Sequence, residues 1–404
     1  MISMDGFWLA QEPREWPSPP SHFSFSSLTE IDSCPRRWAL ENANYPEFWP
    51  GRGYPARPSV QQLCGEVVHL ALNEVTDRLA AEGATEPANV VPVLRSMGGL
   101  SQLVSDCIAR VLSPLKANPR VRERVEATGA RLSQHGPALR LQVQAALSVV
   151  WRCPEYGTAQ KVHRGQGDQQ RALGHGQHPE VWLAPESLPM VGRADLIRLD
   201  SRECEIVDYK TGGPDPSHTE QLREYALLWA RDRVLNPDGR LATDLVVLYG
   251  TDMHRIPGPT ESELARAEED VRTRCQRAAE RLLAIPPPAN VATDNCRYCD
   301  VKHLCSPYWS SMRSDEECGD VPSRFTSLQA LVLSRKGERL WNVTIEKGPH
   351  LPSGQAAMAV VGRHNCWHSG TSVRFMDVRV DQDDDNGSVV IVAGESSELF
   401  ALPG

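Results

Sequence analysis

The first half of the chain places apolar residues at the spacing of amphipathic α-helices. A proline-rich lead of residues 1–20 predicts irregular chain before them. The predicted helices are Ser27–Asn42, Gln61–Ala81, Leu100–Leu115 and Pro137–Val150. The last two fall in a predicted helical insertion of about residues 85–178, which ends in a Gly-, Gln- and His-rich run, 161–178, typical of a loop.

After residue 180 the pattern changes to short apolar runs separated by turn residues, which predict strands. Three such runs, Glu180–Ala184, Met190–Leu199 and Cys204–Lys210, predict a meander. They are followed by a predicted helix at Ser217–Val234, a strand at Asp244–Tyr249 and a long charged helix at Glu261–Leu283. This order of strands and helices predicts an α/β fold.

The last part of the chain, residues 325–404, predicts a small β-rich domain with Gly and Asn turns. Its runs include Ala356–Val361, Ser372–Val380 and Ser388–Ala393. The pattern is compatible with a small barrel such as an OB fold, which holds single strands by stacking bases on aromatic rings. Trp341, Trp367 and Phe375 are either stacking residues of this kind or core aromatics.

Composition narrows the class of protein. The chain has 404 residues, 40% of them hydrophobic and 24% charged, which is typical of a soluble protein with two or three packed units. No apolar run reaches the roughly 20 residues of a membrane span, and no signal peptide is apparent, so we expect a cytoplasmic protein without membrane contact. Eleven cysteines, an odd number and mostly scattered, argue against a disulfide framework.

The net charge of −9 argues against binding nucleic acid through global charge. Residues 101–180 are locally basic, with eleven Lys and Arg against six acidic residues. This stretch is either a groove that follows a nucleic acid backbone or an ordinary solvated helix face.

Candidate chemistry lies on the predicted meander. If the second and third runs are adjacent strands, Asp195 projects from one, while Asp208 and Lys210 project from the same face of the next, because side chains alternate along a strand. Carboxylate oxygens suit Mg²⁺ or Mn²⁺, which would activate a water and neutralise a phosphodiester. Lys210 would position that water or stabilise developing negative charge. An Asp-x-Lys by itself is a weak signal, because exposed strands often carry such ion pairs.

The order of short motifs strengthens this interpretation. Gly65-Glu-Val-Val-His69, Gly192-x-x-Asp195, Asp208-x-Lys210 and Gln221-x-x-x-Tyr225 together resemble the motif series of RecB-type PD-(D/E)xK nucleases. The resemblance implies a restriction-endonuclease-like core, which is a mixed central sheet flanked by helices. It also implies His69 as a metal ligand beside Asp195 and Asp208. It also implies that Gln221 and Tyr225, which share a helix face, approach the active site and the DNA. Glu180 is a further acidic residue at a position where many relatives carry one.

A second group of candidate ligands is Cys296, Cys299 and Cys305. These thiolates need a fourth ligand. In the nucleases that carry an iron–sulfur cluster, such as AddB and the CRISPR adaptation exonucleases, a distant upstream cysteine supplies it. Cys34 matches that position, so the resemblance implies a 4Fe-4S cluster that staples the ends of the nuclease domain together. The alternative is zinc, with His303, Cys318 or Cys34 as the fourth ligand.

The resemblance therefore implies a metal-dependent deoxyribonuclease that acts on single-stranded DNA or DNA ends, in DNA repair or in defence against foreign DNA. The expected nuclease domain covers residues 21–320, with its iron–sulfur region at 285–310. The chain contains no P-loop motif, so a helicase or another partner in trans would have to unwind DNA. The alternative function is a catalytically silent DNA-binding scaffold or zinc-bound adaptor of the same fold.

Overall fold

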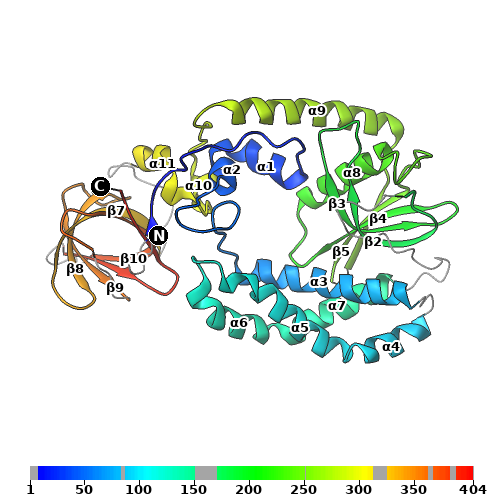
Figure 1. The fold of residues 1–404 in the computed structure, drawn as a ribbon, viewed down its shortest axis with the longest axis horizontal. Helices are drawn as coiled ribbons and strands as arrows, with labels where there is room; N and C mark the ends of the chain where they lie inside the picture. Colours follow the sequence, from blue (N-terminus) through cyan, green and yellow to red (C-terminus); the bar gives the residue numbers. More distant parts are fainter. Residues whose placement is uncertain are drawn as a thin grey trace. The chain divides into compact units, whose positions relative to one another are not determined.

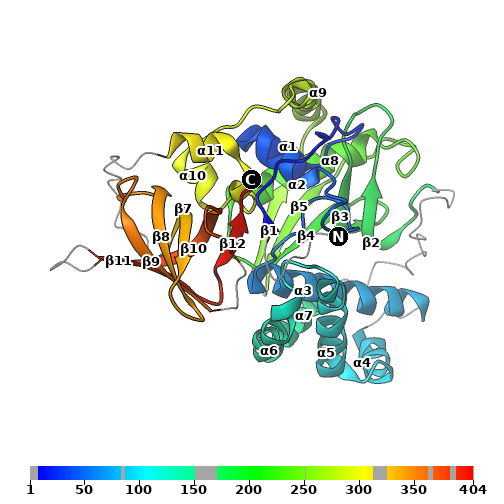
Figure 2. The same ribbon diagram turned by 60° about the vertical axis from the view of Figure 1, so that its left-hand side comes forward.

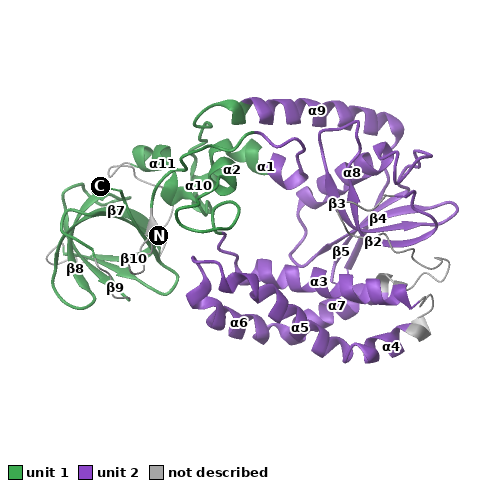
Figure 3. Ribbon diagram, viewed as in Figure 1, with its two compact units in different colours: residues 1–18, 30–55, 281–404 green, residues 19–29, 56–280 purple. Residues whose placement is uncertain are grey.

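The computed structural model describes residues 8–82, 87–150, 171–250, 252–312, 325–362, 367–382 and 388–403. The chain divides into two compact units (Figure 3). Unit 1 comprises residues 1–18, 30–55 and 281–404, and unit 2 comprises residues 19–29 and 56–280. Each unit is therefore built from segments that are distant in sequence.

Unit 2 is built on a five-stranded mixed sheet with the order β2-β3-β4-β5-β6. Its strands are β2 (Gly176–Leu183), β3 (Gly192–Leu199), β4 (Cys204–Lys210), β5 (Asp244–Tyr249) and β6 (Asp252–Pro257). The first three form an antiparallel meander, and β4 pairs with β5 in parallel. The parallel pair requires a crossover, which α8 (Pro216–Arg231) supplies after Asp215 caps its first turn.

Helices cover both faces of this sheet (Figure 1). Helix α3 (Val60–Ala81) packs Leu63 and Val67 against Val207 and Leu248 in one apolar cluster. The helical insertion extends this cluster with α4 (Pro87–Ser96), α5 (Gly99–Leu112), η1 (Pro114–Lys116), η2 (Arg122–Arg124), α6 (Val125–Gln134) and α7 (Gly136–Val150). Above the sheet in Figure 1 lie α8 and the long α9 (Glu261–Leu283). The strand ends that carry polar residues are thus held between two layers of helices.

Unit 1 contains a closed five-stranded barrel whose strands pair in the order β7-β8-β9-β11-β10 and back to β7 (Figure 2). The strands are β7 (Thr326–Arg335), β8 (Leu340–Lys347), β9 (Ala356–Val361), β10 (Ser372–Gln382) and β11 (Val389–Ala393). Only β9 and β11 pair in parallel among these described strands. This order is the OB-fold topology. A strand pair, β12 (Glu398–Ala401) and β1 (Trp8–Leu9), extends the sheet beside β10.

The barrel core contains the three aromatic residues considered above as stacking candidates. Trp341, Trp367 and Phe375 are buried in one cluster, with exposures of 4%, 6% and 0%. They are therefore core aromatics, and the stacking interpretation is wrong for them.

The remaining elements of unit 1 carry the clustered cysteines. They are the end of α1 (Phe25–Ser33), α2 (Pro35–Asn42), α10 (Thr293–Arg297), η3 (Lys302–Leu304) and α11 (Ser306–Ser311). The η3 turn is fixed to the barrel by His303, whose ring stacks on Phe400 at 3.8 Å and whose carbonyl accepts a hydrogen bond from Arg374. Arg374 also lies 4.7 Å from the ring of Trp309.

Several predicted elements need correction. The expected single helix Ser27–Asn42 is two helices, because Cys34 is extended and Pro35, which has no N–H, starts a new helix. Strand β2 begins at Gly176, inside the run predicted as a loop, and residues 161–170 of that run lie outside the described residues. None of the described helices is long and apolar enough to cross a membrane.

Candidate active site and cysteine pocket

The polar site of unit 2 begins where β3 and β4 separate. Their pairing ends at Leu196 and Val207, one position before Asp195 would face Asp208. Instead, the Asp195 carboxylate accepts a hydrogen bond from the backbone N–H of Tyr209 at 2.7 Å. Its other oxygen lies 3.4 Å from Nδ1 of His69 on α3. The structure therefore brings together the His69 and Asp195 side chains from a helix and a strand.

Glu180 completes a group with these two residues. It lies on β2 between the pairs Pro179–Leu196 and Val181–Ala194, and so opposite Asp195. Donor atoms of His69, Glu180 and Asp195 all lie within 4.8 Å of one another. Glu180 has a φ of 52°, a conformation that non-glycine residues adopt rarely and that concentrates at functional sites. In the sequence, Glu180 matches only a position where many relatives carry an acidic residue. Its place opposite Asp195 depends on the pairing of β2 with β3, which the structure supplies.

Asp208 and Lys210 belong to a second, adjoining set of contacts. Nζ of Lys210 lies 2.8 Å from Asp208 and donates a hydrogen bond to Gln221 at 2.9 Å. The Gln221 amide donates in turn to the hydroxyl of Tyr225 at 2.7 Å. The side chains of Asp208, Lys210, Gln221 and Tyr225 therefore form a continuous polar row from β4 to α8.

Charge and burial in this site are suited to a cation. One oxygen of Asp208 is buried and, among the described residues, has the Lys210 ion pair but no hydrogen bond. Burial and the neighbouring Asp195 raise the pKa of Asp208 to about 7. Burial by itself lowers the pKa of His69, but the charges of Asp195, Asp208 and Glu180 raise it to about 9. Crowded carboxylates of this kind fit a divalent metal, which would offset their mutual repulsion.

Two glycines of the motifs allow the close approach of these elements. A Cβ at Gly192 would lie 2.8 Å from the ring of Tyr225 and 2.9 Å from Leu228, both on α8. A Cβ at Gly65 would lie 3.3 Å from the hydroxyl of Thr211, just after Lys210. Glycine at these positions lets α8 and α3 pack directly against the strand ends that carry the site.

We expect Gly192→Ala to destabilise unit 2 by about 1–3 kcal/mol, because the ring of Tyr225 and with it α8 must move away from β3. The hydrogen bond between Lys210 and Gln221 should also weaken, since Gln221 on α8 would move away from Lys210. Urea unfolding measures the loss of stability. Gly136→Ala is the matched control, because a Cβ there meets nothing within 4 Å. Equal stability of the two variants would contradict the packing argument.

One comparison with known proteins shows the family of the chain. A family model described as the PD-(D/E)XK nuclease superfamily matches residues 22–306. The chain belongs to this superfamily. Membership implies nuclease activity and the use of divalent metal in general terms. A solved structure described as the crystal structure of SSO0001 is 19% identical, with 46% of this chain and 80% of that chain covered and a TM-score of 0.23. No curated protein matches the chain.

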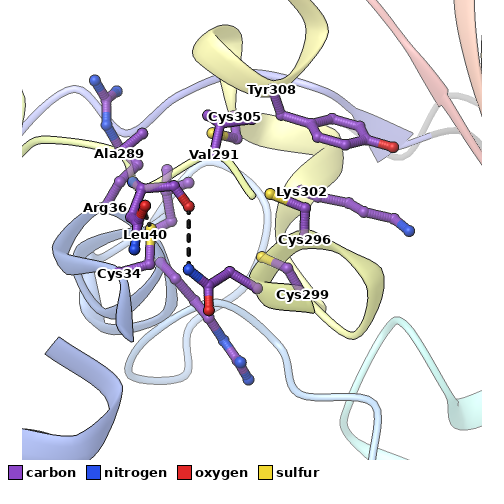
Figure 4. Close-up of a pocket in the computed structure, with 13 residues that line it drawn as sticks. Cys34, Arg36, Leu40, Ala289, Val291, Cys296, Cys299, Lys302, Cys305 and Tyr308 are labelled. Atoms are coloured by element: carbon purple, nitrogen blue, oxygen red, sulfur yellow. Dashed lines mark hydrogen bonds between the residues drawn. The ribbon is translucent and has the colours of Figure 1, made fainter. Parts of the chain in front are cut away.

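The superfamily match extends through the cysteine pocket of unit 1 (Figure 4). Cys34 precedes α2, Cys296 lies in α10, and Cys299 and Cys305 flank η3. All four sulfurs line one pocket with Leu40, Val291 and Tyr308. The structure thus brings Cys34 to the three clustered cysteines, as the resemblance implied. His303 does not line this pocket, because its Nε2 contacts the hydroxyl of Tyr54 at 2.7 Å, and Cys318 lies outside the described residues.

Backbone N–H groups point at the cysteine sulfurs. Asn290 donates to Sγ of Cys34 at 3.5 Å. Burial raises the pKa of the other three thiols, and that of Cys299 reaches about 12. Backbone hydrogen bonds lower these pKa values, from Ala292 to Cys296, from Val301 to Cys299 and from Tyr308 to Cys305. Hydrogen bonds to sulfur stabilise the thiolate, which is the form that binds metal. The donor set therefore fits a metal-bound group of four thiolates.

The distances between the sulfurs bear on the kind of group. Four thiolates around one zinc, at about 2.3 Å each, would place their sulfurs about 3.8 Å apart. In the described part of the chain no three cysteine sulfurs lie within 4.8 Å of one another. In every set of three of these sulfurs, at least one pair is therefore farther apart than a single tetrahedral zinc would hold it.

Charged side chains, of which Arg36 is buried and the others are half-buried, surround the pocket. Arg37 lines it and pairs with Glu41 at 2.9 Å and Glu30 at 3.4 Å. Arg36 is held by Glu12 at 3.1 Å and by the carbonyl of Pro287. These guanidinium groups place positive charge beside the four cysteines, which favours thiolates. Burial, followed by a hydrogen bond and repulsion from Glu41, raises the pKa of Glu30 to about 8.

This pKa predicts a pH-dependent loss of stability. The folded state holds the Glu30 proton more tightly than the unfolded chain, so stability falls as the pH rises from about 4.5 through about 8. We expect Glu30→Gln to be more stable than wild type above this range, by on the order of 1 kcal/mol for a partly exposed carboxyl, and similar below it. Urea unfolding at both ends of the range tests this, with exposed Glu15→Gln as control. A pH-independent difference would contradict it.

Proposed function

We propose that the protein is an Mg²⁺- or Mn²⁺-dependent deoxyribonuclease that hydrolyses phosphodiester bonds in single-stranded DNA or at DNA ends. The observation that carries this proposal is that the His69, Glu180 and Asp195 group adjoins the Asp208–Lys210 pair at the end of β4. His69, Asp195 and Asp208 would hold the metal, and Glu180 is added to them here. When bound, the metal lowers the pKa of a water and neutralises phosphate charge.

The residues around the metal have separable roles in this proposal. Lys210 donates a hydrogen bond to the attacking water or to the phosphodiester oxygen that becomes more negative. Gln221 holds the ammonium of Lys210, and Tyr225 holds Gln221, so the row keeps Lys210 in place before substrate arrives. Asp195, bonded to the Tyr209 N–H, is fixed independently of that row.

In this proposal, the four cysteines of the pocket, Cys34, Cys296, Cys299 and Cys305, hold a 4Fe-4S cluster. Sulfur spacing wider than a zinc site, N–H donors to the thiolates and two flanking arginines support this choice. Its role is structural, because it joins α2 to the α10–α11 segment. The substrate in this proposal is DNA, and the biological role is DNA repair or defence against foreign DNA. A helicase or another partner in trans would supply the single strands.

Degradation of end-labelled single-stranded DNA tests the proposal. Wild type purified without oxygen should cut with Mg²⁺ or Mn²⁺ and stop when EDTA is added. Asp195→Asn and Glu180→Gln should bind Mn²⁺ at least about tenfold more weakly by calorimetry, because each removes an anionic ligand. Wild type that binds DNA but does not cut it under any metal would instead favour the silent scaffold.

A further inference from the structure

A pair of aromatic side chains adjoins Lys210 on the side away from the His69 group. His218, in the first turn of α8, contacts the hydroxyl of Tyr249 through Nδ1 at 2.8 Å. The two rings lie 5.7 Å apart, and the ring of His254 meets Tyr249 edge-on at 5.4 Å. His218 and Tyr249 are half-buried, and His254 is exposed. These residues belong to none of the motifs that carried the family resemblance.

The sheet order fixes where this pair lies. Strand β4, which ends with Asp208 and Lys210, runs between β3, which carries Asp195, and β5, which ends with Tyr249. In the parallel pairing Tyr249 is the direct partner of Lys210. His218 precedes Gln221 by three residues on α8, so both lie on one face of that helix. A DNA strand crossing the sheet edge from β3 to β5 would pass the metal group, then Lys210, then His218 and Tyr249.

The chemistry of His218 suits a phosphate oxygen. Tyr249 engages Nδ1 and so fixes the ring, whereas the ring's other nitrogen, Nε2, makes no hydrogen bond within the described ranges. Burial and the Lys210 ammonium lower the pKa of His218, so the ring is a neutral hydrogen-bonding group beside a cation. With the Tyr249 hydroxyl as donor to Nδ1, Nε2 carries the proton and donates outward.

We propose that His218, oriented by Tyr249, binds the backbone phosphate next to the scissile phosphate on the β5 side of Lys210. This inference rests on the proposed nuclease function and assigns a positioning contact to it. The contact would hold the strand in register so that the neighbouring phosphodiester meets Lys210 and the metal group. It would recognise backbone rather than base, and so act on any sequence.

Single methylphosphonate substitutions in the DNA test this contact, because each removes the charge of one phosphate. Wild type should lose about tenfold in kcat/KM when the phosphate next to the cut is neutralised, the size expected for a hydrogen bond to a charged group. His218→Gln should already show a similar loss on unmodified DNA, mainly in KM, and no further loss on the substituted strand. His175→Gln is the matched control, an exposed histidine beside the start of β2, which pairs with the other end of β3.

The outcomes separate the two proposals. Equal sensitivity of wild type and His218→Gln to the substitution would overturn the phosphate contact while leaving the nuclease intact. Wild type that cuts no DNA would overturn the proposed nuclease function and this phosphate contact with it.

Tyr249→Phe provides a second test that does not depend on the folding of His218→Gln. It should weaken binding of the unmodified strand by about threefold, since the ring loses one hydrogen bond, and partly suppress the methylphosphonate effect. Full sensitivity in Tyr249→Phe would contradict the assigned role of its hydroxyl.

Discussion

Lys210→Met is expected to reduce the rate of DNA cleavage about a thousandfold while leaving metal binding intact. The ammonium of Lys210 lies 2.8 Å from Asp208, and its hydrogen bond to Gln221 holds it there. A donor fixed in this way stabilises charge that develops in the transition state, which is why its loss lowers kcat rather than raising KM. Single-turnover cleavage of labelled single-stranded DNA measures the change.

Metal titration separates this result from a collapsed site. Mn²⁺ should bind Lys210→Met as tightly as wild type or more tightly, because the variant removes a positive charge beside Asp208. The exposed Lys336→Met, in the turn between β7 and β8, serves as the matched control and should cut like wild type. Cleavage by Lys210→Met within about threefold of wild type would remove Lys210 from the mechanism, whatever its position.

Cys34→Ser is expected to remove the visible absorbance near 400 nm of anaerobically purified protein and to destabilise unit 1 by about 3–5 kcal/mol. Cys34 lies in a chain segment that is about 260 residues away from Cys296, and closing so long a loop restricts the unfolded chain strongly. Iron and sulfide analysis should fall in parallel with the colour.

A second cysteine variant shows whether the effect is specific to the pocket. Cys64→Ser changes a half-buried cysteine on α3, outside the pocket, and should keep colour and iron. A colourless wild type that contains one zinc per chain would reject the iron–sulfur assignment and return the zinc alternative. Full colour in Cys34→Ser would show that another residue completes the site.

Elements with a strong apolar period were predictable from the sequence. Helix α9 and strand β9 have the predicted bounds, because the long amphipathic spacing of α9 and the short apolar run of β9 leave little ambiguity. Strand β6 was missed, since it is an edge strand whose residues are nearly all exposed and show no alternation. Helix α4 was missed because Pro92 lies inside it.

The candidate site was predictable where its members lie on one element or in one motif. Asp208, Lys210, Gln221 and Tyr225 were all named, and the structure adds the hydrogen bonds that join the last three. Contacts between distant segments needed the structure. Tyr249 and His218 are 31 residues apart and no spacing relates them. Glu180 acquires its place only through the register of β2 with β3.

His303 connects the segment that carries the clustered cysteines to the β-strands of unit 1. His303 lies two residues before Cys305. Its ring stacks on Phe400 of β12, and its carbonyl accepts a hydrogen bond from Arg374 of β10. Residues of β10 and β12 thus hold the turn between Cys299 and Cys305 in place. A fragment that stops before β7 would leave Trp309, which is 1% exposed in the whole chain, without Phe400 and Arg374 against it. A fragment that ends at the boundary of the family match is therefore expected to lose side chains that shape the cysteine pocket.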